Sequence, residues 1–178
     1  GENLQNGDAF RITAAQMRDA AEHIRSIDPT RPIIIRMHYW DDGDGDFTYK
    51  NPFEAGIADI VMLNIYTNWT ADGIGPAVPD AIAESGADLV RKIRSVDPNA
   101  TVWISIAAFR ESPSFLRPSA HDVTRDIEAA QKIDGIRTIS FFGWGPERYP
   151  EEGAGWYLPR DVADLLEIMR TYAAKAQR

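Results

Sequence analysis

The sequence predicts an α/β fold in which short parallel strands alternate with longer helices. Two observations support this prediction: four short apolar runs lie between segments of helical periodicity, and each run is followed by a helix or a turn. The chain has 178 residues, of which 44% are hydrophobic and 26% are charged, as is usual for one globular domain. We therefore expect residues 1–178 to form a single α/β domain.

Four runs have the length and composition of strands. They span Pro32 to His38, Asp59 to Tyr66, Thr101 to Ala107 and Arg137 to Phe142. In all four runs one set of alternate residues is apolar. The other set is mixed and includes Arg36, His38, Asn64, Tyr66, Ser105, Thr138 and Ser140. One face of the sheet is therefore expected to lie under helices, and the other to be partly polar.

Helix signals lie before, between and after the strands. The helix starts are marked by Thr13, by Pro79 with Asp80, by Ser119 and by Pro159. The helix ends are expected near Ile27, Val96, Ile133 and Ala176, with Gly135 as the C-cap of the third helix. A short helical turn is also expected from Pro52 to Ala55.

A short motif occurs twice and supports the same architecture. The residues Ile24-Arg25-Ser26-Ile27-Asp28-Pro29, before the first strand, are matched by Ile93-Arg94-Ser95-Val96-Asp97-Pro98, before the third. In both copies the proline prevents the helix from continuing. The same helix-to-strand connection is therefore expected at both places.

The mixed strand face favours half of a (β/α) barrel of the TIM type, with four strands and flanking helices. A doubly wound sheet is covered by helices on both faces and has two apolar faces, whereas barrel strands direct one face into a lumen. A complete barrel takes about 250 residues, and the expected strands start about 35 residues apart, so this chain holds only half of one. We expect a missing N-terminal half-barrel or association of two copies. An open flavodoxin-like sheet is the alternative.

Composition excludes several classes of function. The 27 acidic and 19 basic residues give a net charge of -8, which disfavours nucleic acid and anionic membranes as partners. No apolar run approaches the roughly 20 residues of a membrane-spanning helix, so we expect a soluble protein, and a secreted or periplasmic location stays open. The absence of cysteine excludes disulfides and thiolate ligands. We expect no cofactor and no metal site.

The loops that follow the strands carry most of the residues suited to chemistry. In a β/α barrel these loops build the active site. They contain His38, Tyr39, Trp40, Asp41 and Asp42, then Tyr66, Asn68 and Trp69, then Phe109, Arg110 and Glu111, and finally Trp144, Glu147, Arg148, Tyr149 and Trp156. Flat aromatic faces next to carboxylates and amides suit sugar rings. Each aromatic taken singly fits a core role as well as a binding role.

These residues also carry a resemblance. The segments from Val102 to Phe109, Arg117 to Ser119 and Gly135 to Trp144 resemble the last two strands of retaining glycoside hydrolase barrels. The pair His38-Tyr39 is similar to a sugar-contacting motif on the fifth strand of that clan, and Tyr66 stands where its sixth strand often has a tyrosine. The resemblance covers residues 12–176. It implies a domain that binds or hydrolyses a poly- or oligosaccharide at the carboxyl ends of the strands.

The resemblance also implies roles for individual residues. It places Glu2 at the end of the fourth strand of the clan, where the family's acid/base glutamate lies, and the chemistry of the loop residues makes Glu147 the other candidate for the proton donor. Sugar stacking is assigned to Trp40, Trp69 and Trp144, and hydrogen bonds to sugar hydroxyls to His38, Tyr39, Tyr66 and Arg110. The family's nucleophile is missing, because the segment from Ser105 to Phe109 has no acid. Glu111, Glu147, Asp41 and Asp42 are candidates for that role, and a wider carboxylate spacing suits an inverting mechanism.

Two other readings of the sequence stay open. The first is a non-catalytic half-barrel, either a fragment or a domain that self-associates as a homodimer. The second is an open-sheet domain that binds a small ligand at a switch point in its strand order. The segment from Asp42 to Asp46 resembles the start of a calcium loop, but Phe53 stands where the EF-hand pattern has Glu, so a flexible turn is favoured.

Overall fold

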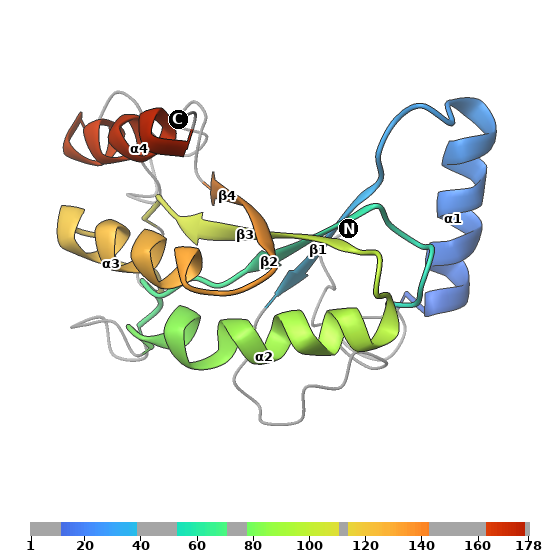
Figure 1. Cartoon of the computed structure of the whole chain (residues 1–178), viewed down its shortest axis with the longest axis horizontal. Coiled ribbons are helices and arrows are strands. Elements are labelled where there is room, and N and C mark those ends of the chain that lie inside the picture. Colours follow the sequence, from blue (N-terminus) through green and yellow to red (C-terminus); the bar gives the residue numbers. More distant parts are fainter. Residues whose placement is uncertain (1–11, 39–52, 71–77, 111–113, 143–162, 177–178) are drawn as a thin grey trace.

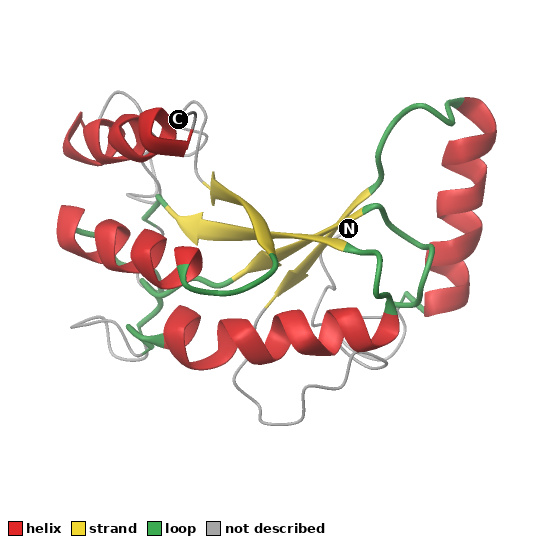
Figure 2. Cartoon of the chain, viewed as in Figure 1, coloured by secondary structure: helices red, strands yellow, loops and turns green. Residues whose placement is uncertain are grey.

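The computed structural model describes residues 12–38, 53–70, 78–110, 114–142 and 163–176. Within these residues the chain is an α/β protein with four helices and one sheet of four parallel strands (Figures 1 and 2). The strands are β1 (Ile34–His38), β2 (Ile60–Asn64), β3 (Thr101–Ala107) and β4 (Ile136–Phe142). All four predicted strands are confirmed, with ends that differ by at most two residues.

The strands lie side by side in chain order, β1-β2-β3-β4. A doubly wound sheet requires a switch point in its strand order. The order of the described strands has none. The strand order of the described residues therefore gives no support to the open-sheet alternative with a central switch point. Sequential parallel strands with right-handed connections place the connecting helices on one side of the sheet.

The helices are α1 (Ala14–Ile27), α2 (Ala81–Val96), α3 (Ala120–Gln131) and α4 (Ala163–Ala176). Two of the predicted starts are capping boxes. Thr13 caps α1 with Gln16 as the reciprocal partner, and Ser119 caps α3 with Asp122. These side chains bond amide groups that would otherwise lack partners at the helix start, which is why the helices begin at these residues.

One predicted cap is wrong. Gly135 does not end α3, because the helix stops at Gln131 and its C-cap is Lys132. Gly135 instead lies in the turn before β4, with φ of 92°, and the guanidinium of Arg94 occupies the space that a Cβ would need. A glycine is required there by both backbone conformation and close approach. The expected helical turn near Pro52 to Ala55 is only a turn at Ala55 and Gly56, closed by Ile57 N donating to Glu54 O (3.3 Å).

The apolar face of the sheet carries the core. Its alternate residues are buried against side chains of α2, α3 and α4, so these three helices pack on the same face. The strand residues of this core are Ile35, Met37, Val61, Leu63, Val102, Ile104 and Ile106. The main helix residues are Ile82, Val90, Ile93, Val123, Ile127, Leu165 and Met169. Burial of this apolar surface is the main stabilising contribution to the fold.

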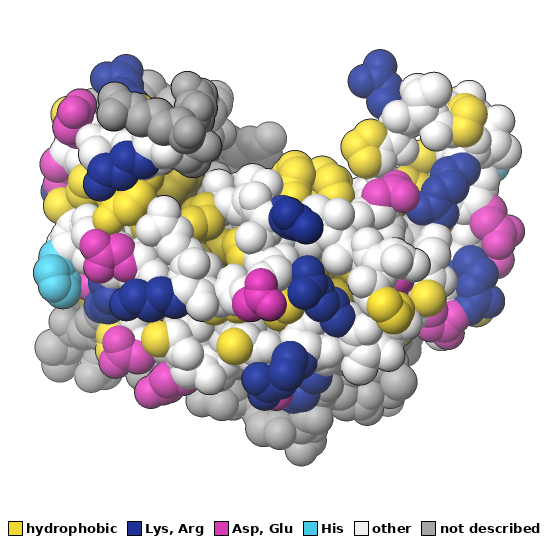
Figure 3. All heavy atoms as spheres, in the orientation of Figure 1, with side chains coloured by type: hydrophobic (Ala, Val, Ile, Leu, Met, Phe, Trp, Pro, Cys, Tyr) yellow, Lys and Arg dark blue, Asp and Glu magenta, His cyan; other side chains and the backbone are white. Residues whose placement is uncertain are grey.

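The opposite face is mixed, as the sequence predicts. Arg36, Met62, Trp103, Thr138 and Ser140 are half-buried there. Figure 1 shows α2 and α3 on one side of the sheet, with α1 at the other end of the molecule from α3 and α4. The space-filling view shows a broad hollow between the α1 and α4 ends (Figure 3). Among the described residues, no helix is long and apolar enough to cross a membrane.

Candidate functional site

A row of polar residues crosses the mixed face near the carboxyl ends of the strands. The strand register places His38 beside Asn64, Asn64 beside Ser105, and Ser105 beside Ser140. Neighbours in a parallel ladder point to the same face, so Asn64, Ser105 and Ser140 form one polar row, and the backbone of His38 lies level with it. Asn64 is 1% exposed, and Ser105 is buried as well. The row places hydrogen-bonding groups at the level where the strands end.

Asn64 has unused hydrogen-bonding capacity in this row. Its Nδ2 and Oδ1 atoms are both buried, and neither has a partner within the described part of the chain. A buried amide without partners costs about 1 to 3 kcal/mol for each unsatisfied group. An unpaired amide of this kind calls for a partner, such as an ordered water or a bound ligand.

Asn68 also has an unused acceptor. Its Nδ2 donates to Phe109 O (2.8 Å) and to Leu116 O (2.9 Å), whereas its buried Oδ1 has no partner among the described residues. The two donated bonds join the loop after β2 to the loop after β3. Asn68 therefore fixes two loops and leaves one carbonyl oxygen available.

Four aromatic rings meet above the ends of β2, β3 and β4. Phe109 lies at the centre, with its ring centroid 5.2 Å from those of Tyr66, Phe115 and Phe142. The guanidinium of Arg36 lies 5.7 Å from the centroid of the Phe142 ring. Edge-to-face and tilted packing of this kind makes a rigid apolar surface. The cluster therefore forms a fixed platform beside the polar row.

The loop that carries Trp69 is held by a short antiparallel pairing. Thr70 N donates to Ser114 O and Leu116 N donates to Asn68 O, both at 2.9 Å. Trp69 stands between these two bonds, and its side chain is 40% exposed. Arg110 in the neighbouring loop is exposed too. An indole and a guanidinium are thus accessible on loops whose backbone is fixed.

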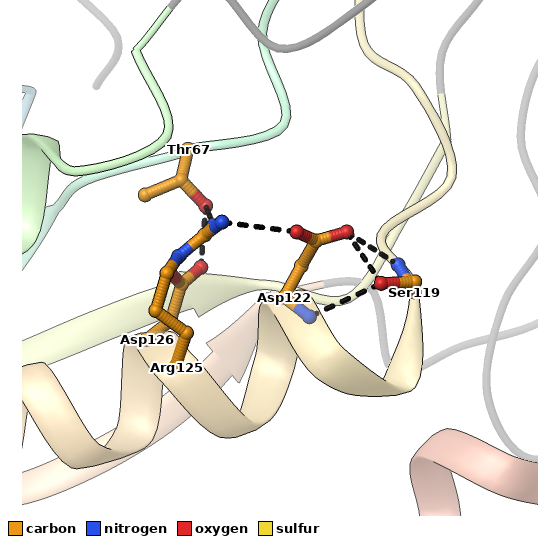
Figure 4. Close-up of polar contacts among 5 residues, drawn as sticks. All are labelled: Thr67, Ser119, Asp122, Arg125 and Asp126. Carbon is orange, nitrogen blue, oxygen red and sulfur yellow. Dashed lines mark hydrogen bonds and ion pairs between the residues drawn. The ribbon is translucent and has the colours of Figure 1, made fainter.

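A polar cluster ties the end of β2 to α3 (Figure 4). Thr67 Oγ1 donates to the buried carboxylate of Asp126. Arg125 bridges two carboxylates, with Nη2 3.0 Å from Asp126 Oδ1 and Nη1 3.0 Å from Asp122 Oδ1. Asp122 also accepts bonds from Ser119 N (2.9 Å) and Ser119 Oγ (2.7 Å). The cluster anchors residue 67, from which the loop to Trp69 begins.

The two carboxyl groups of this cluster have pKa values shifted in opposite directions. Burial raises the pKa of Asp126, and the bonds from Thr67 and Arg125 offset this only in part. Burial also acts on Asp122, but the hydrogen bonds from Ser119 and the charge of Arg125 outweigh it and lower the pKa. Opposed shifts are common in catalytic pairs. Here both carboxylates are engaged by caps and ion pairs, so we assign them an anchoring role.

The described residues include part of the predicted site. Tyr66, Trp69 and Arg110 lie together at the carboxyl ends of β2 and β3. His38 is the last residue of β1, and its backbone lies level with the polar row. Glu2, Tyr39, Trp40, Trp144 and Glu147 lie outside the described residues, as do Asp41, Asp42 and Glu111. Among the described strand residues of the mixed face, none is Asp or Glu.

Sequence reasoning placed Asn64 on the mixed face and Asn68 in the loop after the second strand without giving either a role, and it missed Phe115 and Asp126. An asparagine in an otherwise apolar strand, Ile-Val-Met-Leu-Asn-Ile, was a usable signal for Asn64. Nothing in the local pattern marks Phe115 or Asp126, because their roles arise from contacts with residues more than forty positions away. Their placement depends on tertiary structure alone.

Other features of the described residues were considered as sites. No group of three or more His, Asp or Glu within them is placed to hold a metal ion. A groove of about 570 Å³ lies between α2 and α3, lined by Ala83, Ala87, His121, Arg125 and Lys132 among others. It belongs to the helical layer, and its charged side chains have mixed signs. It does not share the polar row or the aromatic platform.

Comparison with known proteins adds no relative. No protein-family model matches this sequence, and a search of curated proteins finds no similar one. The function is therefore argued from the site alone.

Proposed function

We propose that this chain is a glycoside hydrolase-like, carbohydrate-active domain, half of a (β/α) barrel, that binds a poly- or oligosaccharide at the carboxyl ends of its strands. The observation that carries the proposal is the meeting of three kinds of group at that edge. These are the unpartnered amide atoms of Asn64 and Asn68, the ring platform around Phe109, and the accessible Trp69.

Saccharides present two kinds of surface, and this edge has groups suited to both. The C–H face of a pyranose stacks on a flat ring such as the indole of Trp69, as apolar groups do on aromatic faces. Hydroxyl groups need donors and acceptors at once, and the carboxamide of Asn64 carries both, although its atoms are buried and a saccharide reaches them only when the groups that cover them move. Arg110 adds a donor at the exposed rim. A net charge of -8 also favours a neutral ligand over an anionic one.

Hydrolysis is the further part of the proposal. The proposal assigns the proton donor to Glu2 or Glu147. It assigns stacking on sugar rings to Trp40, Trp69 and Trp144, and hydrogen bonds to sugar hydroxyls to His38, Tyr39, Tyr66 and Arg110. The segment from Ser105 to Phe109 supplies no carboxylate, so a second acid has to come from a loop or from another half-barrel. Without a second acid the same surface binds saccharide without cleaving it, which is the non-catalytic alternative.

Calorimetric titration with a panel of gluco-, manno- and xylo-oligosaccharides tests the binding proposal. We expect at least one series to bind, and Trp69→Ala to weaken its affinity by about tenfold or more, the loss of one stacking contact. Tyr172→Ala is the matched control, because Tyr172 is an aromatic residue on α4 that bonds Glu128 at the surface. No binding in any series, or equal losses in both variants, would overturn the proposal.

Release of reducing sugar from the bound series tests hydrolysis separately. We expect Glu147→Gln or Glu2→Gln to abolish turnover while binding persists. Binding without turnover in the unmodified chain supports the non-catalytic alternative.

A further inference from the structure

The repeated motif of the sequence is also repeated in space. Arg25 Nη1 donates to the carbonyl oxygen of Gly56 (2.8 Å), and Arg94 Nη2 donates to that of Gly135 (3.4 Å). Both glycines have positive φ, 81° and 92°, and both lie in the turn before a strand. The unit that contains α1, β1 and β2 is therefore built like the unit that contains α2, β3 and β4.

Equivalent apolar residues in the two units differ sharply in burial. Ile93 in α2 is 0% exposed, whereas its equivalent Ile24 in α1 is 45% exposed. Val96 is half-buried against the core, whereas its equivalent Ile27 is 72% exposed. In the second unit the repeated motif is covered by other residues of the chain, whereas in the first unit it is exposed to solvent.

The position of α2 in the fold shows which part of the chain covers Ile93 and Val96. Ala83 and Ala87 line the groove towards α3, so α3 lies on that side of α2. Leu89 and Val96 lie about 180° around the helix from Ala87, and they pack on the core. Because the following helix is on the other side, this second side of α2 meets the preceding unit. The residues of α1 that are equivalent to Leu89, Ile93 and Val96 are Ala20, Ile24 and Ile27, and they form an exposed apolar stripe.

The strand next to α1 is also uncovered. β1 and β4 are the two outer strands of the described sheet, so each has one edge without a strand partner there. Ile34 at the start of β1 is 45% exposed. In the second unit the equivalent strand, β3, is paired in parallel with β2 of the first unit. An unpaired, apolar strand edge is an energetically unfavourable surface that proteins usually cover.

We propose that the edge formed by β1 and by Ala20, Ile24 and Ile27 of α1 binds a second copy of this chain through the free edge of its β4. β4 is the last strand of the second unit, as β2 is of the first, so the contact repeats the one already present between β2 and β3. Two copies related by a twofold axis make this contact twice. Eight parallel strands then close without a free edge and enclose both polar rows.

Closure also fixes the register of the new strand pair. Within one copy His38, Asn64, Ser105 and Ser140 are successive partners in the ladder, and the one irregularity between β3 and β4, at Val102 and Trp103, lies before them. In an eight-stranded β/α barrel, a path that follows paired residues once around the barrel returns to its first strand about eight residues away, a displacement called the shear. Each of the two contacts between the copies therefore accounts for a displacement of about four residues. The right-handed tilt of the strands directs the shift towards the amino end of β1. Ser140 of one copy is therefore expected beside Ile34 of the other.

The oligomeric state of the chain tests the proposal, and no saccharide is needed. Light scattering and sedimentation are expected to give twice the 19.9 kDa chain mass. Ile24→Glu and Ile27→Glu are expected to raise the dissociation constant of the dimer at least about tenfold. Ala15→Glu is the control, because Ala15 is exposed and lies about 180° around α1 from Ile24. A monomer at all concentrations, or equal effects of all three variants, would overturn the proposal.

Cross-linking tests the register. The chain has no cysteine, so introduced thiols react alone. A mixture of Ile34→Cys and Ser140→Cys chains, treated with an oxidant or a short bismaleimide, is expected to give covalent dimers of one chain of each kind. A mixture of Ile34→Cys and Ala83→Cys chains, with the second thiol on the exposed side of α2, is expected to give none. A dimer that fails to cross-link through residues 34 and 140 contradicts the proposed edge. Dimers that bind no sugar leave this proposal intact and remove only the proposed function.

Discussion

Truncation of two equivalent isoleucines distinguishes a covered surface from an uncovered one. Ile93 is 0% exposed, so Ile93→Ala removes buried carbon atoms and leaves a cavity, at a cost of about 2 to 5 kcal/mol in the free energy of unfolding. Ile24 is 45% exposed, so Ile24→Ala loses only about half of the roughly 1.5 to 3 kcal/mol that full burial provides. Water fills the space that it leaves. We expect a cost of about 1 kcal/mol for Ile24→Ala.

The comparison is well matched, because both residues occupy the same position of the same motif and both changes have the same intrinsic effect on helix stability. Urea unfolding followed by circular dichroism gives both free energies. At low protein concentration the two costs should differ by about 1 to 4 kcal/mol, as the two ranges imply. At high concentration the cost of Ile24→Ala should rise as association buries the residue. Equal costs at low concentration would refute the assignment of Ile24 to an uncovered surface.

Four further predictions concern stability. Because burial raises the pKa of Asp126 above its ordinary 3.8, its ionisation destabilises the fold, and the stability of the native chain relative to Asp126→Asn should fall as pH rises through the folded-state pKa. Because the pKa of Asp122 is lowered, the native chain should be more stable than Asp122→Asn at neutral pH, and this difference should fade as pH falls below 3.8. Urea unfolding across pH measures the stability of both variants relative to the native chain. Parallel trends for the two variants would contradict the assignment. Asn68→Ala removes two buried donor contacts and should cost about 1 to 3 kcal/mol, with faster amide exchange at residues 114–116; unchanged exchange would show that Asn68 does not join the loops. Gly86→Ala places a methyl group against the terminal carbon of Ile133, at a cost of about 1 to 3 kcal/mol, and gains about 1 kcal/mol in helix propensity. Thermal unfolding should therefore show a net loss of up to about 2 kcal/mol, whereas a net gain would show that Ile133 moves freely.

The fold was predictable because its signals are local. Alternation in the strands separates Leu63 and Ile104 on the core face from Asn64 and Ser105 on the other face, and caps such as Thr13 and Ser119 mark helix starts. The role of Gly135 was not predictable, because the same residue suits a helix end and a turn. Only the position of Arg94, forty-one residues earlier, decides between them.

The candidate site was predictable only in part. The loops after parallel strands are known to meet, and on this ground Tyr66, Trp69 and Arg110 were expected at the carboxyl ends of the strands, where the residues follow β2 and β3. Asn64 becomes significant only when burial shows that its amide lacks partners among the described residues. Asp126 becomes significant only when α3 packs beside residue 67. Such roles depend on long-range contacts that no periodic pattern contains.

The most direct test of the central claim is a backbone amide chemical-shift titration of the isotope-labelled chain with the saccharide series that calorimetry identifies. The account predicts shifts confined to the carboxyl ends of the strands, at residues 64–70, 109–110 and 114–116, and none in the groove between α2 and α3. Shifts centred on His121 and Lys132 in that groove, with an unperturbed strand edge, would contradict it.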